Sequence, residues 1–169
     1  GIKGAVGFKM RILSIDVGVR NFGMSVYCTD AKEFILFKMH DFKKIKDCVK
    51  MMRDFTVQEP FNSADVILVE RQMRSVMKTM ATSIRAFHFD KTIMIAPQSV
   101  KKWFNTCMLA HGSNKKAAIV LARKLLNKKN LAQLEKFKKK DDISDCVVQT
   151  HYYLEKIKTT RCSEGVRVV

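Results

Sequence analysis

MRILSIDVGVRNFG, residues 10–23, is the stretch that decides the fold. Its first seven residues are mostly apolar and β-forming, which predicts a strand. The strand ends in Asp16, and Gly18 follows in a turn. An acid at the carboxyl end of an apolar strand projects into the crevice above the sheet. Charged residues seldom end buried strands without a partner, so Asp16 is the first candidate for a functional acid.

The pattern outward from this stretch predicts an α/β protein. Three consecutive strands and then strands that alternate with helices favour a mixed central sheet flanked by helices. We expect a leader over 1–9, one domain over 10–157 and a tail over 158–169. The strands are predicted over 10–16, 21–28, 33–42, 64–70 and 91–97, and the helices over 43–55, 75–89, 99–104, 114–126, 131–138 and 142–157.

Composition favours a polyanionic partner. Lys and Arg number 32 against 16 Asp and Glu, a formal charge of +16. Nucleic acid is the leading candidate, and the alternative is a basic protein that binds acidic protein surfaces or simply stays soluble. No apolar run reaches 18 residues, so no membrane span is expected. The five cysteines form no CxxC pair, which favours a reducing compartment.

Three further acids occupy informative positions. Glu70 ends the apolar segment ADVILVE as Asp16 ends the first strand. Asp142 and Asp145 lie three residues apart at the start of the last helix, on one helical face. Each acid alone has a structural explanation: a turn cap at Asp16, an ion pair of Glu70 with Arg71 or Arg74, and ordinary first-turn acids on the helix. All four on segments that can converge at one sheet edge favour a common site.

Grouped carboxylates predict a divalent metal. They repel each other and raise one another's pKa, and a bound cation relieves that conflict. Hard oxygen ligands select Mg²⁺ or Mn²⁺ rather than zinc. Two such ions about 4 Å apart can clamp the attacking and leaving oxygens of a phosphoryl transfer. A basic protein with an acidic pocket therefore suggests a metal-dependent nuclease, in which the basic surface holds the DNA backbone.

Three motifs resemble those of the RuvC-type Holliday junction resolvases. They are SIDVGVRNFG at 14–23, ILVERQ at 67–72 and DDISDC at 141–146, and among these proteins the chain looks most similar to the poxvirus resolvases. The resemblance implies a ribonuclease-H-like fold: a five-stranded mixed sheet, whose first three strands we expect to be antiparallel, with helices on both faces. It implies four metal-binding, catalytic carboxylates at Asp16, Glu70, Asp142 and Asp145. Asp141 is then a bystander that could cap the last helix.

The resemblance also implies a homodimer that nicks opposing strands of a four-way junction. The helix after the second acid contributes to the dimer in such relatives. Here its apolar residues are either interface or core: Met73, Val76, Met77, Met80 and Ile84. Bacterial relatives carry an aromatic residue three positions past the second acid, where this chain has Met73. Their base preferences are therefore not carried over.

Lysines dominate residues 101–140. Phosphate contacts by such residues give salt-dependent, largely sequence-independent affinity, although some of them must simply form a solvated face. The candidate DNA-binding residues are Lys101, Lys102, Lys115, Lys116 and Arg74. Lys101 and Lys116 fall where bacterial resolvases place lysines near the active site. Ser113 and Asn114 could cap a helix whose N-terminus receives a phosphate.

Three other functions compete with a junction resolvase. An ATPase of the actin and sugar-kinase class shares the sheet and a D-x-G turn, but this chain lacks a second glycine-rich segment. A non-enzymatic DNA-binding protein would not need Glu70, and a ribonuclease H would differ only in its substrate. For a resolvase we predict nicks with 5′-phosphate and 3′-hydroxyl ends. The poxvirus resemblance implies resolution of genome concatemers in the host cytoplasm.

Overall fold

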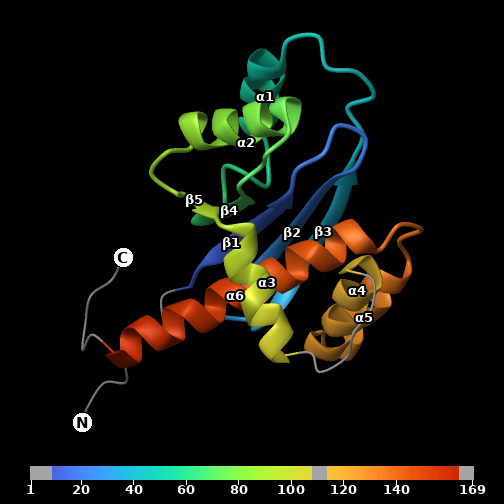
Figure 1. Cartoon of the computed structure of the whole chain (residues 1–169), viewed down its shortest axis with the longest axis vertical. Coiled ribbons are helices and arrows are strands. Elements are labelled where there is room, and N and C mark those ends of the chain that lie inside the picture. Colours follow the sequence, from blue (N-terminus) through green and yellow to red (C-terminus); the bar gives the residue numbers. More distant parts are fainter. Residues whose placement is uncertain (1–8, 108–113, 164–169) are drawn as a thin grey trace.

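The structure, a computed structural model, describes residues 9–107 and 114–163. A five-stranded mixed sheet in the order β3-β2-β1-β4-β5 forms its centre (Figure 1). The first three strands are antiparallel, and β1, β4 and β5 are parallel. This confirms the predicted sheet. The strands are β1 (Arg11–Asp16), β2 (Phe22–Cys28), β3 (Glu33–His40), β4 (Val66–Glu70) and β5 (Thr92–Ile95).

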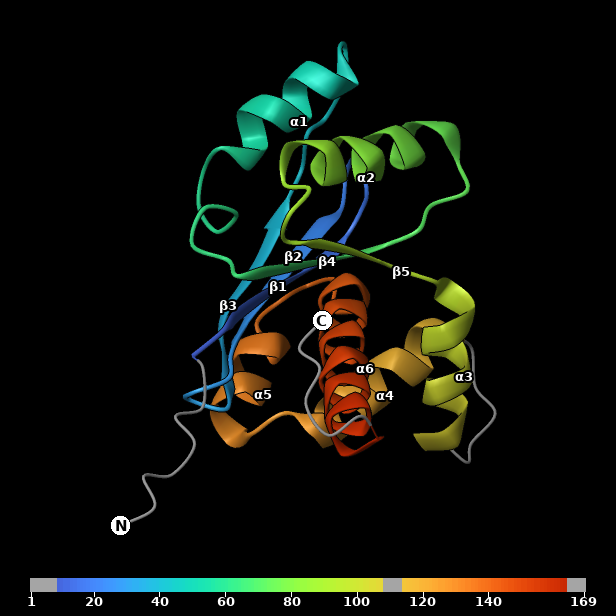
Figure 2. The same cartoon turned by 90° about the vertical axis from the view of Figure 1, so that its left-hand side faces the viewer.

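Helices cover both faces of the sheet, as expected (Figure 2). One face carries α1 (Cys48–Thr56) and α2 (Ser75–Phe87). The opposite face carries α3 (Pro97–Cys107), α4 (Asn114–Leu125), α5 (Lys128–Glu135) and α6 (Asp141–Ser163). None of these described helices is long and apolar enough to cross a membrane.

The period-two pattern of β1 explains this layering. Leu13 and Ile15 pack into the core under α1 and α2, while Ile12 packs on the other face with Leu68. Alternate side chains of a strand point to opposite faces, so a strand buried on both faces reads as one continuous apolar run. Burial of these side chains supplies the main stabilisation of the sheet against its helices.

Helix α2 corrects part of the interface prediction. Met80 and Ile84 are fully buried in the core between α2 and the sheet, and Met77 packs against the same cluster. Side chains with no exposed surface in one chain are unavailable to a partner. Met73 and Val76, in contrast, are 91% and 46% exposed. The apolar stripe is therefore mainly core, and only its N-terminal end remains a candidate interface.

Several helix boundaries differ from the predictions: α3 extends beyond the expected 99–104 at both ends, α5 begins and ends three residues before the expected 131–138, and the largest differences are at α1 and α6. Helix α1 begins at Cys48 rather than at Lys43, because Lys43 has a φ of 60° and the side chain of Asp47 caps the helix through the amide of Lys50. Helix α6 continues to Ser163, so the expected tail boundary at 157 falls inside the helix. The expected leader falls almost entirely outside the described residues.

Candidate active site

Asp16 and Glu70 lie at the same edge of the sheet, each at the end of its strand. β1 and β4 are parallel neighbours in which Ser14 pairs with Leu68 and Ile15 with Val69. Each strand ends on its acid, so the two carboxylates follow these pairs at adjacent carboxyl ends. Both residues are partly buried. Parallel pairing thus brings together two acids that are 54 positions apart in the chain.

Helix α6 brings Asp142 and Asp145 to the same edge. Its N-terminal part lies over β1 and β2, and β2 carries Gly23 directly beneath Asp142. A Cβ built on Gly23 would lie 3.2 Å from the Cβ of Asp142, so the glycine permits this close approach. Asp141 is the first residue of α6 rather than the residue before it, which corrects its assignment as a cap. Sequence reasoning did not identify Gly23 as part of the site.

The four acids, which we call the acid cluster (Asp16, Glu70, Asp142 and Asp145), interact electrostatically. Burial, the negative charge of Asp145 and a hydrogen bond with the Asp142 carboxyl raise the pKa of Asp16 well above its usual range. Burial also raises the pKa of Glu70. Desolvation and then the charges of Asp142 and Glu70 raise the pKa of Asp145 to about 7. Asp145 itself is exposed to solvent. The interactions among the four carboxylates confirm that the chain segments that carry them converge.

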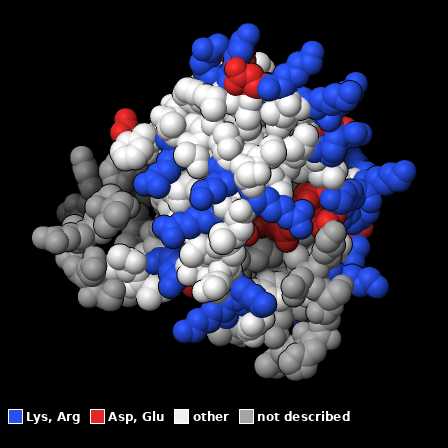
Figure 3. Space-filling view, turned by 45° about the horizontal axis from the view of Figure 1, so that its top comes forward, with Lys and Arg blue, Asp and Glu red and all other residues white. Residues whose placement is uncertain are grey.

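One lysine lies against the acid cluster. The Nζ of Lys139 donates to Oδ2 of Asp142 at 2.7 Å and lies 3.7 Å from Oδ2 of Asp141. These carboxylates raise the pKa of Lys139, the hydrogen bond with Asp142 first among them. Figure 3 shows acidic side chains on the face toward the viewer with Lys and Arg on several sides of them. The arrangement agrees with the expected acidic site on a basic protein.

The acid cluster fits hard divalent cations in its donor chemistry. All four members offer carboxylate oxygens, and burial together with the negative charges of neighbouring carboxylates raises the pKa of Asp16 and Asp145, a conflict that a bound cation would relieve. Within the described residues, no group of three or more His, Cys, Asp or Glu is already arranged to hold one ion. Binding would therefore require these side chains to rotate toward a common centre and Asp142 to share or release its contact with Lys139.

Gln149 holds α6 on the two acid-bearing strands. Its Nε2 donates to Oγ of Ser14 at 2.8 Å and to the carbonyl of Leu68 at 3.2 Å, and it lies 3.4 Å from the carbonyl of Ile15. Gln149 is 4% exposed and Ser14 is fully buried. These contacts lie two residues before Asp16 and Glu70 and one helical turn after Asp145. Sequence reasoning missed Gln149, although its signal was a polar residue within an apolar helical stretch.

The predicted DNA-binding residues lie on the surface where the structure describes them. Lys101 and Lys102 on α3, Lys116 on α4 and Arg74 before α2 are all exposed. The side chain of Lys115 lies outside the described part, as does Ser113, so the proposed phosphate-binding cap there stays a prediction. Exposure makes these four residues available to DNA without placing any of them at the acid cluster.

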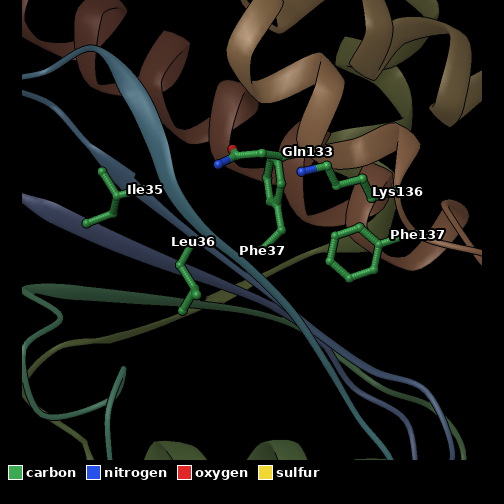
Figure 4. A pocket seen from close by; sticks show the side chains of 6 residues that line it. All are labelled: Ile35, Leu36, Phe37, Gln133, Lys136 and Phe137. Carbon is green, nitrogen blue, oxygen red and sulfur yellow. The ribbon is translucent and has the colours of Figure 1, made fainter.

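A cavity of about 340 Å³ between β3 and α5 is separate from the acid cluster. Figure 4 shows Ile35, Leu36 and the ring of Phe37 on its β3 side, and Gln133, Lys136 and the ring of Phe137 on its α5 side. Phe37 and Phe137 also pack against buried residues of the core beneath. None of the four acids lines this cavity. Its walls offer no carboxylate, so it does not share the chemistry of the acid cluster.

Two solved structures have similar folds. The fowlpox virus resolvase, solved in complex with its substrate Holliday junction DNA, matches at 22% identity with a TM-score of 0.64, over 88% of this chain and 99% of that one. The RuvC of T. thermophilus, solved with a Holliday junction substrate, matches at 12% identity and a TM-score of 0.60, over 87% and 96%. At these identities the likeness shows a shared ribonuclease-H-like fold.

Sequence comparison identifies a family. None of the curated proteins matches the chain. The model of the family described as the poxvirus A22 protein matches residues 10–156, which include all four acids of the cluster. This match spans most of the 169 residues. The chain therefore belongs to the poxvirus A22 protein family.

Proposed function

We propose that this protein is a metal-dependent endodeoxyribonuclease that resolves four-way DNA junctions. The convergence of Asp16, Glu70, Asp142 and Asp145 from two strands and one helix carries the proposal. A chain of net charge +16 that gathers four carboxylates at one sheet edge combines a surface for the DNA backbone with ligands for cations. The two similar folds were both solved with junction DNA, which supports this substrate.

The acid cluster supplies the reaction's framework. Asp16, Glu70, Asp142 and Asp145 would hold Mg²⁺, or Mn²⁺ in its place, and orient the scissile phosphate above the sheet edge. When bound, such ions stabilise negative charge on a phosphoryl group and lower the pKa of a coordinated water. In-line attack of water at phosphorus would break the bond to the 3′ oxygen. The ends would be a 5′-phosphate and a 3′-hydroxyl, so that each nick could be sealed by a ligase.

A homodimer would place two such sites on one junction and allow paired nicks. The exposed end of the α2 stripe, Met73 and Val76, is the surface we assign to that contact. Membership of a poxvirus family supports a role in resolving linked viral genomes. We place that role in the host cytoplasm, a reducing compartment that agrees with the free thiols of Cys28, Cys48 and Cys146.

A cleavage assay on a mobile four-way junction beside a linear duplex of the same sequence tests the proposal. With Mg²⁺, we expect paired nicks in the junction and little cutting of the duplex. Asp16→Asn should keep junction binding and abolish cleavage. Asp30→Asn, which changes an exposed acid after β2, is the matched control and should cut normally.

Each failure has its own meaning. Cleavage retained by Asp16→Asn would refute the assignment of the acid cluster. Equal cutting of duplex and junction would refute the substrate but not the nuclease. Ligation of the nicked products by DNA ligase checks the proposed ends, since a 3′-phosphate would block sealing.

A further inference from the structure

Lys139 stands at a position that the reaction outlined above does not use. It precedes α6 by two residues, and its ammonium group contacts Oδ2 of Asp142 at 2.7 Å. Among the described residues, no other Lys, Arg or His forms an ion pair with a member of the acid cluster. Its charge also interacts with Asp16 and Asp145. One ammonium therefore interacts with three members of the acid cluster, Asp142, Asp16 and Asp145.

The contact between Lys139 and Asp142 can open from the solvent side. The Lys139 side chain is 45% exposed, whereas that of Asp142 is only 13% exposed. The carboxylate is thus fixed between α6 and β2, while the lysine reaches it from the solvent side. A lysine ammonium on its flexible stem can leave without disturbing the core. A cation that enters the acid cluster competes for the same Asp142 oxygen and also repels the ammonium.

The neighbouring lysines do not share this position. The Nζ of Lys140 donates to the carbonyl of Phe137 at 2.6 Å, which holds its charge against the backbone before α6. Lys138 is exposed and has no ion pair with a described acid. Three consecutive lysines thus have three different environments, and only Lys139 lies at the acid cluster. Lys138 is therefore a natural control for a change at Lys139.

We propose that Lys139 is a displaceable counter-ion and a positioning residue for the scissile DNA. Without metal, its ammonium holds the Asp142 carboxylate and offsets repulsion within the acid cluster. A divalent cation takes over that oxygen, and the released ammonium then pairs with a DNA phosphate beside the cluster. A metal ion would thereby replace the Lys139 ammonium at Asp142, and the ammonium would pair with the substrate instead. This inference rests on the proposed nuclease function.

Mn²⁺ binding to the full chain without DNA, measured by titration calorimetry, tests the first half. Lys139→Gln removes the competing ammonium, and we expect Mn²⁺ to bind roughly two- to fivefold more tightly. Lys139→Arg keeps the charge and should bind Mn²⁺ no more tightly than the unchanged protein. Lys138→Gln removes one charge from the same segment without touching Asp142 and should leave Mn²⁺ affinity unchanged. Equal affinities in Lys139→Gln and Lys138→Gln would overturn the counter-ion role.

Steady-state cleavage of the junction at saturating Mn²⁺ tests the second half. Lys139→Gln should raise KM for the junction by severalfold more than Lys138→Gln does, and Lys139→Arg should restore much of the loss. A KM in Lys139→Gln no higher than in Lys138→Gln would overturn the phosphate contact. These outcomes differ from failure of the function itself, in which the unchanged protein would neither bind Mn²⁺ nor cut the junction.

Discussion

Replacing Gln149 by leucine removes the polar contact that holds α6 on β1 and β4. The substitution keeps a side chain of similar size, so the cavity it creates is small. It deletes the donor to Oγ of Ser14 at 2.8 Å and to the carbonyl of Leu68 at 3.2 Å. Both groups are fully buried, so water does not replace the lost donor. The change therefore isolates the hydrogen bonds of one side chain.

The expected cost follows from these contacts. A net intramolecular hydrogen bond contributes about 0.5–1.5 kcal/mol, and a buried group left without a partner costs about 1–3 kcal/mol. The contact of Gln149 with the carbonyl of Ile15, at 3.4 Å, adds little. We therefore expect Gln149→Leu to lower the free energy of unfolding by about 2–3 kcal/mol. In a chain of this length the midpoint of thermal unfolding would fall by about 4–12 °C.

Urea unfolding of Gln149→Leu, Ser14→Ala and the double variant measures this cost and its origin. Because the double variant leaves neither hydroxyl nor amide unpaired, it should be about 1 kcal/mol more stable than the sum of the single losses predicts. Junction cleavage, measured well below the unfolding temperature, should also fall in Gln149→Leu because Asp145 lies one turn away on α6. A loss below about 0.5 kcal/mol, or strict additivity, would refute the reasoning.

Four further substitutions test the site, the core and the proposed dimer contact. The raised pKa of Asp145 means that the stability of the metal-free, unchanged protein falls as pH rises from 3.8 to about 7. Asp145→Asn should lose this pH dependence of stability, and thermal unfolding in EDTA across this pH range measures it. Gly23→Ala places a Cβ 3.2 Å from that of Asp142 and should cost about 1 kcal/mol in urea unfolding and weaken Mn²⁺ binding. Met80→Ala should cost about 2–5 kcal/mol, whereas Met73→Ala should keep stability within about 0.5 kcal/mol and weaken self-association in ultracentrifugation.

The strands and the acids at their ends were predictable because their signals are local. A strand buried on both faces must be apolar throughout, so a single acid at its end is conspicuous in the sequence. The same holds for the pair Asp142 and Asp145, whose spacing fixes a common helical face. The parallel pairing of β1 with β4, which brings Asp16 and Glu70 together, came from the structure. Local patterns were therefore sufficient for the strands and for the four acids as candidates, while the resemblance to the resolvases supplied the five-stranded sheet.

The burial of α2 needed the tertiary structure. Helical periodicity marks an apolar stripe but is the same whether the sheet or a second protein covers it. The structure places Met80 and Ile84 under the helix and leaves Met73 exposed. The start of α1 is a similar case, since the left-handed backbone of Lys43 and the cap at Asp47 shorten a segment whose apolar spacing continues further.

The surroundings of the acids were likewise decided only by the fold. Amino-acid type and spacing determine that Asp16, Glu70, Asp142 and Asp145 carry charge, and where each lies along its strand or helix. They do not determine that Gly23 lies beneath Asp142, that Gln149 joins α6 to two strands, or that Lys139 contacts the cluster. These contacts, except that of Lys139, join residues more than 80 positions apart, and only packing sets their distance. Lys139 is close in sequence to Asp142, but so are Lys138 and Lys140. The direction of each ammonium depends on how α6 packs against the sheet.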